Sequence, residues 1–142
     1  MWGKGPPKDN LESWQDIRKF IAEFPDNTSW SKWKPMVLDV VSVLDARCLA
    51  PVFRIGQSMH HIIFLTRDHH QLTSSPRVTL SFLPKEQTVR VTYSCANLHL
   101  SEPLSQETMP FSQAVPCILR YLRRLWSETK PALPIPEGLN AD

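Results

Sequence analysis

Four of the chain's five histidines lie in one short stretch, MHHIIFLTRDHHQL at residues 59–72, as two adjacent pairs. Histidine side chains bind transition metals and transfer protons near neutral pH, so such a cluster could form a metal site or an acid–base site. The apolar run between the pairs predicts a strand. At about 3.3 Å per residue, that strand separates the pairs by roughly 17–20 Å, so they cannot bind one ion.

Strand geometry leaves only the second pair as a candidate site. Adjacent residues on a strand point to opposite faces, so His60 and His61 cannot chelate one ion together. Asp68, His69 and His70 lie in the predicted loop RDHHQLTSSP, where side chains can converge. These three residues are candidates for a metal or acid–base role. The alternative is that they are solvated loop residues, and that His60 or His61 is a partly buried strand residue.

Cys117 is a candidate nucleophile. It stands near the N-terminus of a predicted helix at 112–129, and Arg120 follows it by one helical turn. Both the helix dipole and the guanidinium favour a thiolate, so they predict a lowered thiol pKa. A nucleophile also needs a base or an oxyanion hole, which the local sequence does not supply. The alternative is an inert thiol covered by another element.

Two groups of side chains are typical of binding surfaces. Trp30 and Trp33 lie three residues apart in NTSWSKWKP, and Arg120 and Arg124 lie on one face of the predicted helix 112–129. Interface hot spots are enriched in Trp and Arg, so these four residues are candidate partner contacts. The alternative for the tryptophans is that they close an edge of the core.

The basic residues of the last helix also raise the hypothesis of nucleic-acid binding. Sheet-based RNA readers stack bases on exposed aromatic side chains. Phe82 and Tyr93 share their strand parity with aliphatic residues, so the exposed face of the sheet is predicted to carry Thr, Ser and Arg instead. The net charge of +2 is also small for a phosphate-binding surface. A solvated face is the better interpretation.

Hydrophobic periodicity predicts the elements that position these residues. Apolar residues three or four apart predict helices over residues 11–24, 35–49 and 112–129. Strand-like patterns predict two consecutive hairpins, built from strands 52–55 and 60–66 and from strands 77–83 and 88–95. The predicted class is therefore α+β, with an antiparallel sheet of about four strands packed against two N-terminal helices and one C-terminal helix.

Composition predicts where the domain begins and ends. Residues 1–8 are rich in Gly, Pro and Lys and predict a flexible tail. The last segment, PALPIPEGLNAD at 131–142, is rich in proline and predicts an extended tail that is not helical. A single domain is expected over 9–130.

Composition also argues against several classes of protein. The chain is 42% hydrophobic and 21% charged, as in ordinary globular proteins, and it contains no apolar run of membrane-spanning length. Its three cysteines have no C-x-x-C spacing, which favours a reduced cytoplasmic protein over a disulfide scaffold or a zinc ribbon. The sequence has no P-loop, G-x-G-x-x-G, G-x-S-x-G or H-E-x-x-H motif.

These observations favour a non-enzymatic domain that binds another protein and needs no cofactor; a homodimer is compatible with this hypothesis. The alternative is a small metal- or thiol-dependent enzyme that uses Asp68, His69 and His70, or Cys117. Nucleic-acid binding through the basic C-terminal helix is a further alternative.

Overall fold

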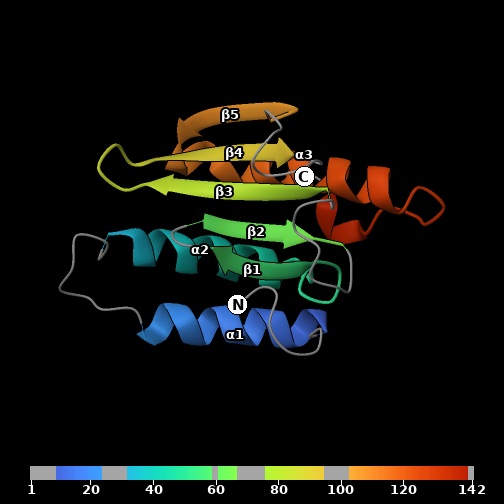
Figure 1. Ribbon diagram of the computed structural model, residues 1–142, viewed down its shortest axis with the longest axis horizontal. Helices are drawn as coiled ribbons and strands as arrows, with labels where there is room; N and C mark the ends of the chain where they lie inside the picture. Colours follow the sequence, from blue (N-terminus) through green and yellow to red (C-terminus); the bar gives the residue numbers. More distant parts are fainter. Residues whose placement is uncertain (1–8, 24–31, 59–60, 67–75, 95–102, 141–142) are drawn as a thin grey trace.

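The computed structural model describes residues 9–23, 32–58, 61–66, 76–94 and 103–140. A five-stranded antiparallel sheet, with its strands in chain order from β1 to β5, forms the centre of the fold (Figure 1). The strands are β1 (Arg54–Ser58), β2 (His61–Leu65), β3 (Arg77–Leu83), β4 (Thr88–Ser94) and β5 (Ser105–Pro110).

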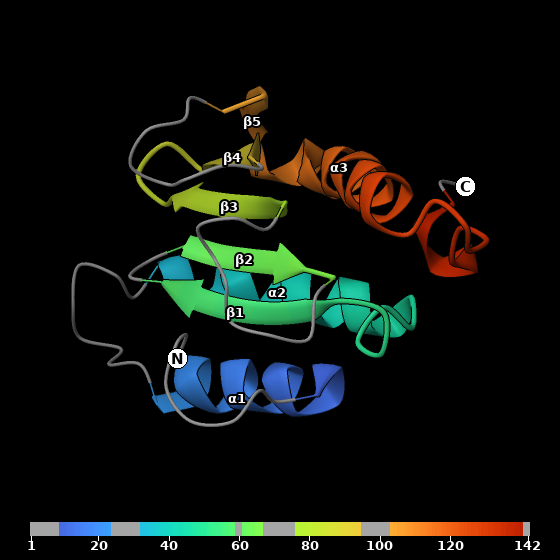
Figure 2. The ribbon, with the colours of Figure 1, turned by 45° about the vertical axis from the view of Figure 1, so that its right-hand side comes forward.

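The α-helices of the described residues are α1 (Asn10–Glu23), α2 (Trp33–Ala46) and α3 (Ala114–Thr129). Helices α2 and α3 lie on the same side of the sheet, and α1 lies beside β1 (Figures 1 and 2). One core of buried side chains joins sheet and helices, including Val40, Phe64, Leu80, Val91 and Leu122. The predicted α+β class is confirmed, with five strands rather than about four.

The second predicted hairpin agrees closely with the structure. Strand β3 has the predicted bounds, and β4 ends at Ser94. Its alternation places Val78, Leu80 and Phe82 in the core, opposite Tyr93, Val91 and Val89. Apolar residues alternate with polar ones over residues 78–82 of β3 and 89–93 of β4, so a shift of the pairing by one residue would turn these buried side chains to the other face of the sheet.

The first predicted hairpin is correct in kind, but its first strand is shifted. We expected a strand at 52–55 and a break at residues 56–58, whereas β1 runs through Gly56 to Ser58, which pairs with His61. Gly56 lies within the strand opposite Ile63, so here glycine does not interrupt pairing. The buried body of β2 is as predicted: Ile62 through Leu65 are buried, and His61 opens the strand exposed.

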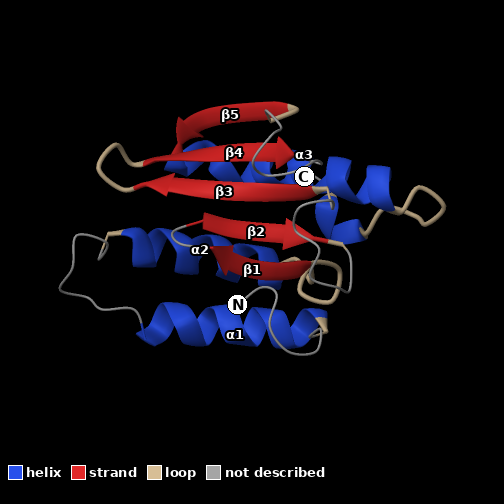
Figure 3. Ribbon diagram, viewed as in Figure 1, coloured by secondary structure: helices blue, strands red, loops and turns tan. Residues whose placement is uncertain are grey.

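Helix α1 covers the outer edge of β1. The Ser13 hydroxyl accepts a hydrogen bond from the Ile55 backbone N–H at 3.1 Å, and the Trp14 indole N–H donates to the Phe53 carbonyl at 2.8 Å. An ion pair between Arg18 and Asp45 also joins α1 to α2. This edge of the sheet is therefore closed to a further strand (Figure 3).

The C-terminal segment corrects the predicted domain boundary at residue 130. Residues 131–140 do not extend away as a tail: Glu137–Leu139 form a short 3-10 helix, and Leu139 is buried in the core. The Arg47 Nε donates to the Gly138 carbonyl at 2.8 Å, and the Trp126 indole donates to the Pro134 carbonyl at 3.1 Å. Proline content predicted an extended backbone for this segment but not its packing. A single buried leucine and side-chain donors from Arg47, Arg123 and Trp126 anchor it.

Candidate protein interface

Strand β5 forms the second edge of the sheet, and its backbone groups alternate in direction. In an antiparallel pair, every second residue exchanges hydrogen bonds with the neighbouring strand. The Phe111 N–H donates to the Gln87 carbonyl at 2.8 Å, so the odd-numbered residues of β5 point their backbone groups at β4. The even-numbered residues Gln106, Thr108 and Pro110 consequently point their backbone groups outward, in the plane of the sheet and away from β4. Pro110 has no N–H, which fits an outward position.

The outer edge of β5 is exposed. Gln106, Thr108 and Pro110 are all exposed, and no helix or strand of the described residues lies along this edge (Figures 1 and 3). In the described part of the chain, the outward N–H groups of Gln106 and Thr108 meet no hydrogen-bond acceptor. The edge therefore offers two backbone donors, unlike the β1 edge, where Ser13 accepts the N–H of Ile55.

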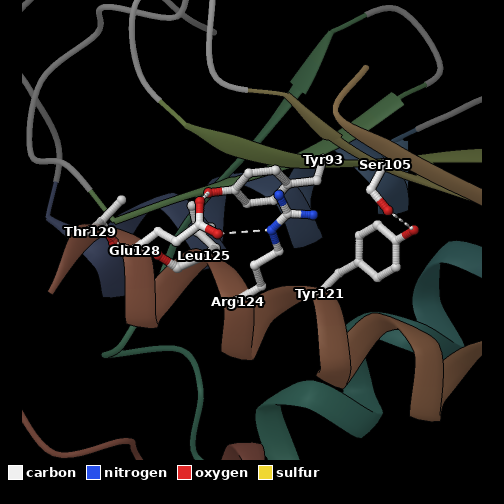
Figure 4. Close-up of polar contacts among 7 residues, drawn as sticks. All are labelled: Tyr93, Ser105, Tyr121, Arg124, Leu125, Glu128 and Thr129. Atoms are coloured by element: carbon white, nitrogen blue, oxygen red, sulfur yellow. Dashed lines mark hydrogen bonds and ion pairs between the residues drawn. The ribbon is translucent and has the colours of Figure 1, made fainter. Parts of the chain in front are cut away.

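A polar cluster holds β4 against α3. The Tyr93 hydroxyl donates to the Glu128 carboxylate at 2.7 Å, and the Arg124 Nε donates to the same carboxylate at 2.9 Å (Figure 4). The Arg124 guanidinium also lies over the Tyr93 ring, 4.3 Å from its centroid. The hydrogen bond from Tyr93, with help from Arg124, lowers the pKa of the Glu128 carboxyl. Arg124 thus orients Glu128 and covers Tyr93.

A second polar group joins β5 to α3. The Ser105 and Tyr121 hydroxyls share a hydrogen bond at 2.9 Å (Figure 4). The Arg120 guanidinium donates to the Glu107 carboxylate at 2.7 Å, and this bond lowers the pKa of the Glu107 carboxyl. Glu107 therefore carries a charge on the side of β5 that faces α3. Such an inward-pointing charge on an edge strand limits which strands can pair with it.

The arginines predicted to contact a partner are ion-paired on the surface of α3. Arg120 pairs with Glu107 and Arg124 with Glu128, so neither contributes an unbalanced positive charge. This pairing weakens the hypothesis of a nucleic-acid surface on the last helix, because phosphate binding depends on uncompensated cations. Arg120 is still well exposed, with 62% of its side chain accessible beside β5.

The two tryptophans predicted as partner contacts have different outcomes. Trp33 begins α2 and is completely buried in the core, so the structure places it as a core residue, the alternative considered for it. Trp30 lies outside the described residues.

Cys117 is not the activated thiol that its helix position suggested. The side chain is 4% exposed, and burial is the main reason that its pKa is raised rather than lowered. Arg120 acts in the predicted direction, but desolvation outweighs it because the thiolate would lose its water. The buried position agrees with the alternative considered for this residue, a thiol covered by another element. Cys117 lies off the main apolar stripe of the helix, and Tyr121, one turn later, is buried on the same side.

The metal hypothesis rested on residues that the structure does not describe. Asp68, His69 and His70 lie outside the described ranges, so their predicted role stays a prediction. Elsewhere, within residues 9–23, 32–58, 61–66, 76–94 and 103–140, no group of three or more His, Cys, Asp or Glu side chains could hold a metal ion. None of the helices in those ranges is long and apolar enough to cross a membrane.

Comparisons with known proteins give no further guide. No protein family, no curated protein and no solved structure matches this chain. The assignment of function therefore depends on the chemistry of the surfaces described above.

Sequence reasoning missed the β5 edge. The segment SQETMP has no apolar alternation. Its half-buried side chains are those of Ser105, Glu107 and Met109, and only the last of these is apolar. The available signal was Pro110, which ends the segment just before the predicted helix 112–129. Pairing with β4 was needed to show that this polar segment is a strand.

Replacing Tyr93 by phenylalanine tests the polar cluster between β4 and α3. We expect the free energy of unfolding to fall by about 1–2 kcal/mol, because the hydroxyl donates to a charged carboxylate that remains partly solvated when the bond is lost. Ser105→Ala is the control, since it removes only a neutral hydroxyl that is bonded to the Tyr121 hydroxyl, and it is expected to cost about 0.5–1 kcal/mol. Urea unfolding followed by circular dichroism measures both, and a larger loss for Ser105→Ala would contradict the interpretation.

Proposed function

We propose that this chain is a non-enzymatic interaction domain that binds an extended segment of another protein chain by strand addition at the outer edge of β5. One observation carries the proposal: the outward N–H groups of Gln106 and Thr108 are exposed without an acceptor in the described residues, whereas α1 closes the opposite edge of the sheet. Added strands of this kind bind through main-chain hydrogen bonds.

The surroundings of β5 provide selectivity for the added strand. Alternate side chains of such a strand would face the two sides of the sheet. On one side they meet the Arg120–Glu107 ion pair, and on the other they meet Thr108 and the Arg90 side chain that donates to it. Only two outward N–H groups are available, because Pro110 lacks one, so the pairing is short and its partner must match this pattern.

We also propose that the domain works in a reducing compartment, the cytoplasm. Among the described cysteines, Cys48 is exposed and Cys117 is buried, and both are free thiols. Free cysteines of this kind are typical of intracellular proteins, since exposed thiols are readily oxidised outside the cell.

A displayed library of short random peptides, selected on the whole chain, tests the strand-addition proposal. We expect selected peptides to bind the Thr108→Pro variant at least about tenfold more weakly, because this variant loses an outward N–H and adds a ring at the edge. The variant should fold, since proline is tolerated where an edge N–H faces solvent. Thr108→Ala keeps the N–H and is the matched control.

Two measurements accompany the selection. Circular dichroism and the urea midpoint establish that both Thr108 variants fold like the original chain. Amide chemical shifts locate the bound peptide, and we expect the largest changes at Gln106 and Thr108. Peptides that bind Thr108→Pro as tightly as the original chain would show that β5 is not the binding edge.

A further inference from the structure

The hydrogen-bonding groups on the outer edge of β5 are complementary to themselves. Each copy of the chain offers the N–H groups of Gln106 and Thr108 as donors and the Thr108 carbonyl as an acceptor. The outward Pro110 carbonyl accepts the first bond of the 3-10 helix Phe111–Gln113 and has a second lone pair for the added strand. Resting on the strand-addition function above, we propose that the segment added to β5 is β5 of a second copy. The product is a two-fold symmetric dimer whose strands pair antiparallel around Thr108.

The register centred on Thr108 uses every available donor. Thr108 of one copy then lies opposite Thr108 of the other, and each N–H donates to the carbonyl across the axis. Gln106 lies opposite Pro110 of the second copy and donates to its carbonyl. Proline therefore occupies a position that has to supply only an acceptor. A Thr–Thr pair is also among the favourable cross-strand combinations.

The two registers centred nearer the start of β5 are less favourable. Centring the pair on Glu107 would place two carboxylates directly opposite each other, and like charges in that position are destabilising. Centring it on Gln106 would require the Leu104 N–H, which already donates to the Tyr93 carbonyl at 2.9 Å. The register around Thr108 instead places Glu107 opposite Met109 of the second copy. Charge repulsion therefore disfavours the register centred on Glu107, and the lack of a free donor disfavours the one centred on Gln106.

The rest of the sheet prevents further copies of the chain from adding to the dimer. Each copy uses its β5 edge in the dimer, and α1 covers the β1 edge at the other end of the sheet. A two-fold contact consumes the same patch on both copies, so no third chain can add. Among the described residues, Leu104, which lies just before β5, is a large apolar side chain that is 55% exposed.

Sedimentation equilibrium of the whole chain is the first test. We expect a concentration-dependent mass that rises toward twice that of one chain. Thr108→Pro should weaken dimerisation at least about tenfold, since the substitution removes the donor on both sides of the axis. Thr108→Ala retains the N–H and loses only the Thr–Thr side-chain pair, so it should dimerise within about fivefold of the original chain.

Disulfide trapping tests the register. In a background carrying Cys48→Ser and Cys95→Ser, which leaves only the buried Cys117, the Thr108→Cys variant should form a covalent dimer under mild oxidation. Opposed residues of a hydrogen-bonded pair have Cα atoms about 5.5 Å apart, within the range that a disulfide spans. Gln106→Cys is the matched control on the same exposed face. Its two copies would be separated by about four residues of strand, roughly 13 Å, and should not crosslink.

The outcomes separate this inference from the strand-addition function. A chain that remains monomeric at millimolar concentration, while library peptides still bind at Gln106 and Thr108, overturns the dimer and leaves strand addition standing. A dimer that Thr108→Pro does not weaken uses another surface and also overturns the inference. Crosslinking of Gln106→Cys as fast as Thr108→Cys overturns the register. If neither peptides nor a second copy bind at β5, both proposals fail.

Discussion

Replacing Trp33 by alanine is expected to lower the free energy of unfolding by about 3–5 kcal/mol, the usual cost of deleting a fully buried tryptophan. Trp33 is completely buried, although it is the first residue of α2 and follows a polar segment. Its loss removes apolar contacts and leaves a cavity that the surrounding helices cannot fully close. Urea unfolding followed by circular dichroism measures the effect.

The matched control for this prediction is Leu38→Ala on the same helix. Leu38 is 37% exposed, so truncating it should cost about 1 kcal/mol or less. The comparison also separates the two interpretations of Trp33. A tryptophan that serves as a partner contact could be truncated with little effect on unfolding, so equal stabilities of the two variants would contradict the core position.

Replacing Gly138 by alanine is expected to destabilise the fold by about 1–3 kcal/mol, the range for overpacking a filled site. A Cβ at this position would lie 2.1 Å from the Arg47 carbonyl oxygen, and that oxygen belongs to the backbone and cannot rotate away. The segment would have to shift, which would disturb the Arg47–Gly138 hydrogen bond and the buried Leu139. The urea midpoint measures the loss.

Leu133→Ala provides the control in the same C-terminal segment. Leu133 is 53% exposed, so its truncation should change the free energy of unfolding by about 0.5 kcal/mol or less. If Gly138→Ala were as stable as the original chain, the close packing of residues 134–140 against Arg47 would not exist in solution. The predicted boundary at residue 130 would then be the better one.

The two ends of the sheet explain how this small fold handles its edge strands. At β1 the N–H of Ile55, which points away from β2, donates to the Ser13 hydroxyl, and helix α1 lies along this edge (Figure 1). The β5 edge is only partly protected against pairing with other strands. Pro110 removes one backbone donor, and Glu107 places a charge on the face of β5 toward α3. Partial protection limits indiscriminate pairing while it leaves a short, selective edge for one partner strand.

Local sequence determined the parts of the structure in which a pattern repeats. The alternation of Val78, Leu80 and Phe82 with polar residues was sufficient to predict β3, its buried face and its partner β4. The apolar run after His61 likewise predicted the buried body of β2 and separated the histidine pairs. In each strand the local order of apolar and polar residues determines which side chains face the core, because side chains in a strand alternate with a period of two.

Tertiary structure alone decided the features that depend on distant partners. Strand β5 exists because β4 offers it hydrogen bonds, since its own residues are mostly polar. The pKa of the Cys117 thiol is raised because the fold buries this side chain, a cost that outweighs the nearby Arg120. The C-terminal segment packs because Arg47, far away in the chain, reaches the Gly138 carbonyl. Desolvation and long-range hydrogen bonds are set by which segments meet, and no local pattern of residues contains that information.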